Sequence, residues 1–363
     1  MANENITAKE TLNEMWQGLS NTLQQTSELV EDATKNADSI DRAEGYRHTL
    51  RLLHHAMGIF IEDADPLRPY FTRVMTPTVK YFGDNPDVYY DRASINGKQG
   101  YRIKGKRGTV TYLGFIIYRR SRNNRIASNI NVDDSIVGPD GTFEIILSPE
   151  EQDGNWFQLD PLAWELVARQ YFLDMDNEIP ATYEIECLGE NPKAPPFLSD
   201  KQLAKGVSFI NRFIPSALER CIEFTEDIFR NPNEFIPYDP LNPIAQLFSP
   251  TSDNQYVVAA FQLQQDEAMV ITVKPPDTIY WSIQLWNRWF ESLDFRYHQV
   301  IINKHQAHLE PDGTFSVIVA LQNPGMPNWL DTAGHKEGLV CFRWMLCEEN
   351  PEPKCKVVKL NEL

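Results

Sequence analysis

The chain has 363 residues, of which 42% are hydrophobic and 23% are charged, a composition typical of a folded globular protein. Its formal net charge of −17 repels phosphate backbones and anionic headgroups, which excludes nucleic acid and membrane surfaces as expected partners. No apolar run reaches the roughly 18 residues of a membrane span, the polar start lacks a secretory signal, and the five cysteines are irregularly spaced, so we expect a cytoplasmic protein with reduced thiols.

Two amphipathic helices are expected in an N-terminal helical region, residues 1–66. Apolar side chains recur at helical spacing from about residue 7 to 34 and again from about 39 to 62. Pro66 ends the second helix, because the residue before a proline resists helical geometry.

Glycines, prolines and β-forming residues dominate residues 67–190, which predicts a first β-module there. A capping box from Ser199 to Gln202 then begins a long amphipathic helix. Because prolines crowd the end of this stretch, residues 191–250 are expected to form a helical segment and a proline-rich connector. The β-forming pattern returns in residues 251–363, which we assign to a second β-module.

The two β-forming regions resemble each other. PDGTFEIILS at residues 139–148 matches PDGTFSVIVA at residues 311–320, and an Asn-Trp pair follows each of them. Arg169 and Arg343 come next at nearly the same spacing. Coincidence around a common turn is the alternative, but three separated matches in the same order favour a duplication. A strand arginine present in both copies is more often part of a buried ion pair than a catalytic group.

These patterns predict an α+β chain. We expect two related antiparallel β-sandwich or jelly-roll-like modules in tandem, with N-terminal and interdomain helices. Two copies are too few for a solenoid, and the sequence leaves open whether the two modules share one sheet or form separate sandwiches.

The second module contains a recognisable string of motifs: YWSIQLWNRWFESLDFRYHQ from Tyr280, NPGMPNWLDTAGH from Asn323, and the closing CFRW. On these motifs the chain resembles the domain-of-unknown-function family numbered 1214, which is related to the family numbered 1254. DNPDVYY from Asp84 and the DGTFEIILSPE turn resemble the N-terminal region of the same proteins. The resemblance implies a β-sandwich-type architecture with helical additions, and it implies no particular reaction or cofactor.

The long loop at residues 322–338 presents candidate catalytic groups, because loops held by a β-scaffold often hold sites. His335 is a candidate general acid or base, with Asp331 as the group that orients it. Asn328 and Trp329 are candidate substrate-binding residues. The alternative is a structural network around buried backbone groups. The first module favours that alternative, since its Asn-Trp pair occurs without a histidine.

A second group of candidates follows a predicted strand. Glu291 is a candidate catalytic carboxylate. Asn287, Trp289 and Arg296 add an amide, an aromatic ring and a base, which suit a sugar, polyol or carboxylate ligand. An internal ion pair between Glu291 and Arg296 is the alternative.

Asn303 and His305 complete the candidate substrate-binding set, because they face the same side of an extended segment. No metalloprotease motif or comparable ligand spacing is present, so we expect no metal and no cofactor. A metal site would require Glu291 and three histidines to converge through the tertiary fold: His298, His305 and His335.

Three functions remain open. The first is a cofactor-free hydrolase or lyase acting on a small polar or amphipathic metabolite, such as a sugar, polyol or lipid-like alcohol. The second is a non-enzymatic carbohydrate- or lipid-binding module. The third is a structural or oligomeric interaction protein, since tryptophan-rich β faces often become subunit contacts. The expected partners are a small-molecule ligand and further copies of the chain in a homo-oligomer.

Overall fold

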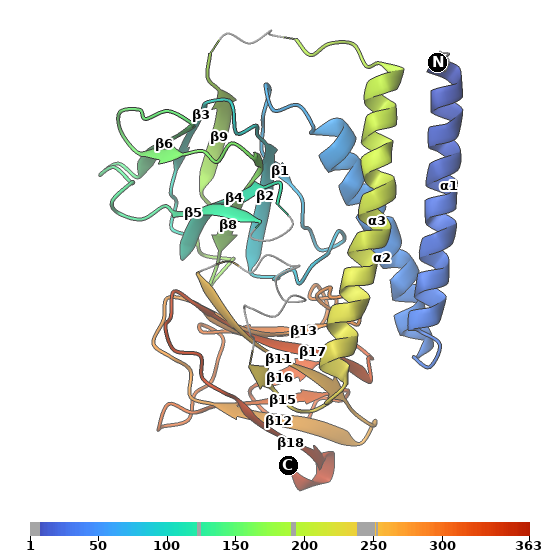
Figure 1. The fold of residues 1–363 in the computed structure, drawn as a ribbon. Coiled ribbons are helices and arrows are strands. Elements are labelled where there is room, and N and C mark those ends of the chain that lie inside the picture. Colours follow the sequence, from blue (N-terminus) through green and yellow to red (C-terminus); the bar gives the residue numbers. More distant parts are fainter. Residues whose placement is uncertain (1–7, 122–124, 190–193, 238–250, 252) are drawn as a thin grey trace.

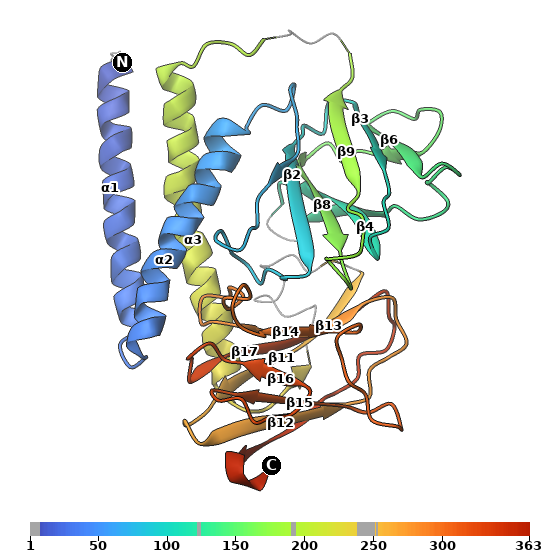
Figure 2. The same cartoon turned by 180° about the vertical axis from the view of Figure 1, so that it is seen from behind.

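The computed structural model describes residues 8–121, 125–189, 194–237, 251 and 253–363. The described residues form three long helices that stand along one flank of two β-modules, one module above the other (Figure 1). Seen from behind, the third helix runs past both modules (Figure 2). No described helix is long and apolar enough to cross a membrane.

The helices form where the apolar spacing predicts them. They are α1 (Ala8–Ala33), α2 (Ser39–Met57), the π-helical turn that continues α2 (Gly58–Glu62) and α3 (Asp200–Phe229). α3 begins at the predicted capping box, where the Ser199 hydroxyl accepts from the Gln202 backbone N–H, and it stays continuous through Pro215. The three helices share one apolar cluster, which also includes Trp289 of the second module.

The first module is a sandwich of two sheets. Its five-stranded sheet has the order β1-β2-β8-β4-β5, and its four-stranded sheet has the order β7-β6-β3-β9. Neighbouring strands are antiparallel except β6 and β7, which are parallel. The strands are β1 (Thr72–Arg73), β2 (Val88–Ser94), β3 (Tyr101–Lys106), β4 (Tyr112–Arg119), β5 (Ile126–Asn131), β6 (Thr142–Ser148), β7 (Trp156–Gln158), β8 (Ala163–Tyr171) and β9 (Thr182–Cys187).

The second module repeats this plan strand for strand, with the orders β10-β11-β17-β13-β14 and β16-β15-β12-β18. β15 and β16 form the equivalent parallel pair. The strands are β10 (Ile236–Pro237), β11 (Asn254–Gln262), β12 (Glu267–Val273), β13 (Trp281–Trp286), β14 (Ile301–Asn303), β15 (Phe315–Ala320), β16 (Trp329–Asp331), β17 (Glu337–Met345) and β18 (Lys354–Lys359), followed by a 3₁₀ turn (Leu360–Glu362). The predicted α+β class and duplication are confirmed, while residues 238–250 of the predicted connector lie outside the described residues.

Each module keeps its apolar core between its own two sheets. On β8, Leu166 faces this core, so the alternating residues Val167 and Arg169 face outward. β17 repeats the arrangement, with Phe342 in the core and Arg343 on the outer face. The outer faces of both five-stranded sheets therefore border the space between the modules and the helices.

Candidate functional site

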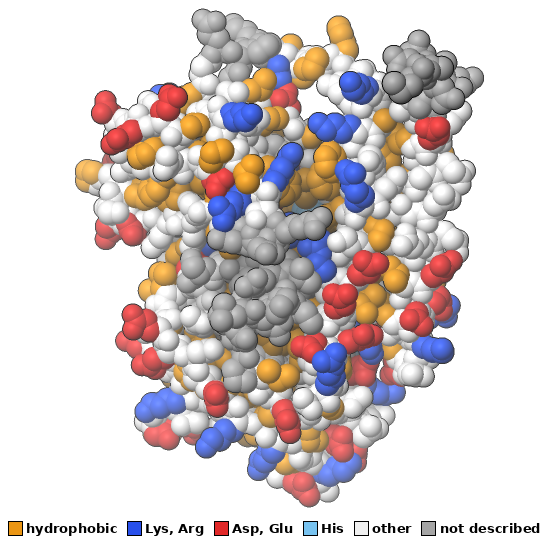
Figure 3. Space-filling view, viewed as in Figure 1, with side chains coloured by type: hydrophobic (Ala, Val, Ile, Leu, Met, Phe, Trp, Pro, Cys, Tyr) orange, Lys and Arg blue, Asp and Glu red, His pale blue; other side chains and the backbone are white. Residues whose placement is uncertain are grey.

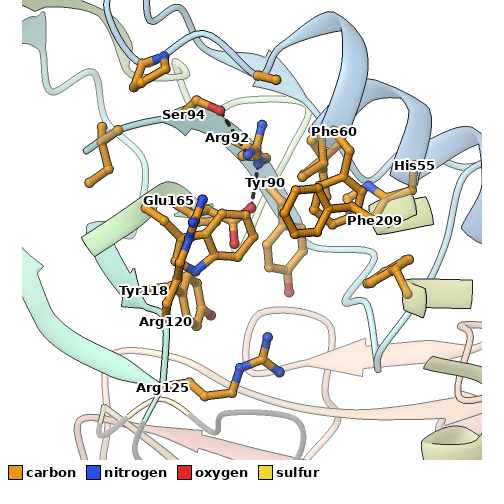
Figure 4. A pocket seen from close by; sticks show the side chains of 18 of the residues that line it. His55, Phe60, Tyr90, Arg92, Ser94, Tyr118, Arg120, Arg125, Glu165 and Phe209 are labelled. Carbon is orange, nitrogen blue, oxygen red and sulfur yellow. Dashed lines mark hydrogen bonds and ion pairs between the residues drawn. The ribbon is translucent and has the colours of Figure 1, made fainter. Parts of the chain in front are cut away.

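A cavity of about 1520 Å³ lies where the two modules meet the helices. Its wall combines α2 with its π-helical turn, α3, the outer faces of β2, β4 and β8, and strands β11, β13 and β17 of the second module. Figure 4 shows side chains from α2, α3 and the first module pointing into this space. Because separate parts of the chain enclose it, the cavity exists only in the assembled fold.

The cavity is basic although the chain is strongly acidic. Among the described residues, lysines and arginines on the wall outnumber acidic side chains. Figure 3 shows blue side chains gathered between the first module and α3, whereas both signs are mixed lower on the same face. The basic lining residues are Arg68, Arg92, Arg119, Arg120, Arg125, Arg169, Lys205 and Arg343, and the acidic ones are Glu62, Asp65 and Glu165. A wall of this sign attracts anions.

Two tyrosine–arginine pairs related by the duplication face the cavity. Arg169 on β8 lies opposite Tyr90 on β2, and Arg343 on β17 lies opposite Tyr256 on β11. Burial raises the pKa of Tyr256 to about 12 and the pKa of Tyr90 well above its ordinary value. Both phenols therefore stay protonated at neutral pH and can donate an O–H.

Both terminal nitrogens of Arg169 are hydrogen bonded. Nη2 donates to Asp253 Oδ2 at 2.8 Å and to Asn129 Oδ1 at 3.1 Å, and Nη1 donates to Thr251 Oγ1 at 3.1 Å. Burial alone would raise the pKa of Asp253, but the Arg169 guanidinium and neighbouring hydroxyls hold that pKa below its ordinary value. Arg169 therefore forms the buried ion pair expected of a repeated strand arginine, and this pair joins the two modules.

Arg343 has no such partner within the described chain. Its side chain is buried, Nη2 donates to the Gly83 carbonyl at 3.3 Å, and the guanidinium carbon lies 5.3 Å from the centre of the Tyr256 ring. Nε and Nη1 are buried without a hydrogen-bond partner among the described residues. Arg169 and Arg343 therefore differ in the hydrogen-bond and charge partners of their guanidinium groups.

Aromatic rings line the part of the cavity near α2 and α3. Phe60 and Phe209 stack with ring centres 5.5 Å apart, and Phe213 meets Phe60 edge-on. His55 packs against Tyr81, and burial lowers the pKa of His55 to about 3, so its imidazole is neutral at physiological pH. This end of the cavity offers apolar surface to a ligand.

The predicted catalytic residues His335 and Glu291 lie at the contact between α2 and the second module. His335 is 3% exposed; its Nε2 lies 2.9 Å from Glu44 Oε2, and its Nδ1 bonds to a backbone carbonyl. Burial opposes protonation of His335, but Glu44 raises its pKa above the ordinary value. Glu291 is fully buried, with its oxygens 2.8 Å from His48 Nδ1 and 2.5 Å from Arg51 Nη1. Both residues thus connect α2 to the second module.

Asn287 and Trp289 belong to the same contact. Asn287 Nδ2 donates to Glu44 Oε2 at 2.7 Å, and Trp289 Nε1 donates to the Asp41 carbonyl at 2.7 Å. Gly45 allows this approach, since a Cβ there would lie 2.4 Å from an atom of the Trp289 ring. The structure therefore brings four predicted site residues together, but against a helix rather than around a cavity.

The expected contact between Asp331 and His335 is not formed. Asp331 Oδ2 lies 2.8 Å from His298 Nδ1 instead. Ala333 and Gly334, between the two predicted partners, both have positive φ. The chain therefore turns sharply there and directs His335 toward α2.

The other predicted binding residues are scattered over the second module. Asn303 reaches the first module, where its Nδ2 donates to Asp87 Oδ2 at 3.0 Å. Arg296 pairs with Asp294 at the surface instead of with Glu291. The rest are His305, which is largely exposed, and Asn328 and Trp329, which donate to backbone carbonyls of their own module. None of the ten predicted site residues lines the cavity.

One cluster at the α2 contact has the donor atoms of a metal site. Asp41, Glu44 and His335 each offer an atom within 4.8 Å of the others. Burial raises the pKa of Asp41 to about 6, and its buried Oδ1 has no hydrogen-bond partner among the described residues. The four residues that the sequence offered as metal ligands do not come together in the fold, since His298 bonds to Asp331 and Glu291 bonds to α2. The lack of a resident metal stays a prediction.

The period-two pattern on β2 is the signal that could have indicated the cavity from the sequence. Tyr90, Arg92 and Ser94 alternate with residues that face the module core, which marks a polar outer face. The spacing of Arg169 and Arg343 predicts that they are equivalent, but no sequence pattern shows that the outer faces of their strands border one space. The cavity itself is therefore a product of tertiary packing.

Comparison with known proteins supports the fold. An uncharacterized protein from Burkholderia cenocepacia, of known crystal structure, is 33% identical; the match covers 98% of this chain and 100% of that one, with a TM-score of 0.92. The VPA0106 protein from Vibrio parahaemolyticus is 12% identical, covers 92% of this chain and 100% of its own, and has a TM-score of 0.50, which shows the fold alone. No curated protein matches the chain.

The fold and site define a class of protein: tandem β-sandwiches flanked by three helices, with a basic and aromatic cavity between the modules. The family described as protein of unknown function, DUF1214, matches the chain twice, at residues 89–172 and 259–348. Each match falls within one module. The chain belongs to the DUF1214 family, and the resemblance seen in its motifs is confirmed.

Proposed function

We propose that this protein binds a small amphipathic molecule in the cavity between its modules and acts as a binding module. The observation that supports the proposal is a cavity of about 1520 Å³ with arginines on one part of its wall and stacked aromatic rings on another. Pockets for small molecules commonly measure about 300–1,000 Å³, so a ligand and several waters have room. The two kinds of wall suit a ligand with one charged or polar end and one apolar end.

The hydrolase or lyase hypothesis has weaker support. It depends on His335 and Glu291, and both bond to buried side chains of α2. Among the described residues, His55 is the one histidine on the cavity wall. Its pKa of about 3 is far from the value that suits a general base near pH 7. These observations favour binding over catalysis.

The expected homo-oligomer and the cytoplasmic location stay predictions and do not depend on this proposal. Size-exclusion chromatography with light scattering measures the oligomeric state directly. A structure of the assembled protein would then show whether the cavity mouth stays accessible.

The neutral probe N-phenyl-1-naphthylamine, which fluoresces in apolar surroundings, tests the proposal. We expect saturable binding to the wild-type protein and displacement by octan-1-ol. Val167 points into the cavity from β8, so Val167→Trp should occupy part of the space and weaken probe binding by about tenfold, which corresponds to roughly 1.4 kcal/mol.

Val358→Trp is the matched control. Val358 lies partly exposed on β18, outside the cavity wall, so this variant should bind the probe as the wild type does. Equal weakening by both substitutions, or none by either, would place the probe elsewhere and refute the proposal.

A further inference from the structure

The geometry points to Arg343 as the residue that holds the anionic head of the cavity's ligand, a carboxylate or phosphate oxyanion attached to an apolar body. This inference rests on the proposed ligand binding and adds the chemical class of the ligand. The repetition of this arginine in both modules predicts a structural role for it, so a ligand-binding role is not expected from the sequence.

The guanidinium of Arg343 is buried without compensation from the described chain. Burial of a charge is costly unless the charge is paired and hydrogen bonded. Arg169, at the equivalent position, shows the usual solution, because Asp253 pairs with it at 2.8 Å. Arg343 leaves Nε and Nη1 unbonded among the described residues. A bound oxyanion would supply what Asp253 supplies in the other copy.

Neighbouring carboxylates do not fill this role. Asp87 is close enough to interact electrostatically with Arg343. However, Asp87 Oδ2 accepts from the Tyr280 hydroxyl at 2.9 Å and from Asn303 Nδ2 at 3.0 Å. These bonds hold the Asp87 carboxylate at the junction of the two modules, and it forms no ion pair with Arg343 within the described chain.

Tyrosines share the cavity wall with Arg343. Tyr256 is its cross-strand neighbour, with the ring centre 5.3 Å from the guanidinium carbon, and Tyr90 and Tyr171 line the same cavity. Protonated phenols can donate to an oxyanion, and the planar fork of a guanidinium matches the spacing of carboxylate and phosphate oxygens. Arginine and tyrosines together thus provide the donors of an oxyanion site.

The other buried arginine of the first-module wall is already engaged. Arg92 pairs with Glu165 at 2.5 Å and also donates to Ser94 (Figure 4). Arg343 is therefore the buried guanidinium on the wall that remains without a carboxylate among the described residues. The cavity wall has more basic than acidic residues, and this excess adds a positive electrostatic potential around Arg343.

An apolar surface lies directly beside Arg343. Cys341 shares its face of β17 and is the cross-strand neighbour of Val258 on β11. Both residues belong to one cluster with Trp286 and Phe290, and all but Cys341 line the cavity. A ligand whose head binds Arg343 would lay its apolar body against this cluster.

Displacement of N-phenyl-1-naphthylamine by three ligands with the same chain tests the inference: octan-1-ol, octanoate and octyl phosphate. We expect octanoate, octyl phosphate or both to bind the wild-type protein about tenfold more tightly than octan-1-ol. A preference for octanoate alone identifies a carboxylate head, and a preference for octyl phosphate alone identifies a phosphate head. Either result supports the inference.

Arg343→Gln should abolish the preference for the anion and leave octan-1-ol binding within about twofold of the wild type, because the substitution removes the charge and keeps the apolar wall. Retained octan-1-ol binding also shows that the variant is folded. Arg230→Gln is the control, since Arg230 is exposed at the end of α3 and pairs with Asp227. It should keep the preference.

The outcomes separate the two proposals. Failure of octan-1-ol to displace the probe refutes the proposed cavity binding. Displacement by octan-1-ol with no advantage for either anion, or an advantage that survives in Arg343→Gln, leaves cavity binding intact and overturns the role of Arg343.

Discussion

Arg169 and Arg343 occupy equivalent positions in the two modules, yet within the described chain only Arg169 is paired with a carboxylate. The β-strands around them match in order and register, so the difference does not come from the scaffold. It comes from Asp253, which stands at the start of the second module and reaches Arg169 in the first. The arginine therefore joins the modules in one copy and, within the described chain, has no carboxylate partner in the other.

This difference predicts unequal effects on stability. Arg169→Gln should lower the free energy of unfolding by about 3 kcal/mol, because it leaves Asp253 buried without its charge partner. Arg343→Gln should change it by less than about 1 kcal/mol in the absence of ligand, since no described carboxylate loses a partner. Urea denaturation of both variants measures the two values. Equal losses would mean that Arg343 also has a structural anion partner.

The bond between His335 and Glu44 predicts a pH-dependent contribution to stability. Burial opposes ionisation of both groups, but their contact raises the pKa of His335 above 6.5 and lowers that of Glu44 below 4.5. The charged pair should therefore stabilise the fold most between about pH 4.5 and 6.5. The contribution should be lost as pH rises through the raised pKa of His335, and as pH falls through the lowered pKa of Glu44.

The stability difference between wild type and His335→Gln, measured by denaturation from well below pH 4.5 to well above pH 6.5, checks the expectation. Asp41, Arg47, Arg288 and Glu337 also face the pair and are present in both proteins, so their titration largely cancels. His305→Gln is a control at a largely exposed histidine. A difference that is flat with pH would show that His335 stays neutral.

We expect that substitution of Glu291 lowers the stability of the protein and has no direct effect on ligand binding. Glu291→Ala removes the partner of two α2 side chains, buried His48 and mostly buried Arg51, and should cost about 3–5 kcal/mol. Asp331→Ala, at a partly exposed pair, should cost less than about 1 kcal/mol. Thermal unfolding compares them. A Glu291 variant that is as stable as wild type but fails to bind octan-1-ol would restore Glu291 as a site residue.

At Gly45, a substitution that ordinarily stabilises a helix is expected to destabilise the protein. Alanine in place of a helical glycine ordinarily stabilises by up to about 1 kcal/mol. At Gly45, however, the new methyl would meet the rigid Trp289 ring at 2.4 Å, so Gly45→Ala should destabilise by about 1–3 kcal/mol. Gly18→Ala in α1 is the control, because the nearest atom there is the movable end of Asn211. A stabilised Gly45→Ala would show that α2 sits farther from the second module.

The fold followed from local patterns, whereas the site did not. The PDG turns and the following Asn-Trp pairs are short segments whose order survives duplication, so they predicted two matching modules. Asn287 and Glu291 looked like a ligand-binding group because a sequence does not show that Glu44 and His48, more than two hundred residues earlier, are their partners. Contacts at that separation depend on how α2 docks, and no local pattern encodes it.

The two modules carry an arginine at equivalent positions, and the ion pair of Arg169 with Asp253 already joins the modules. Because Arg169 has that role, position 343 is not needed to join the modules, and it can change without destabilising the fold. The residue at this position would then determine which ligands bind. Arginine would favour acidic compounds, and a neutral residue would favour uncharged ones. Members of the family could in this way exchange ligands while they retain the same architecture.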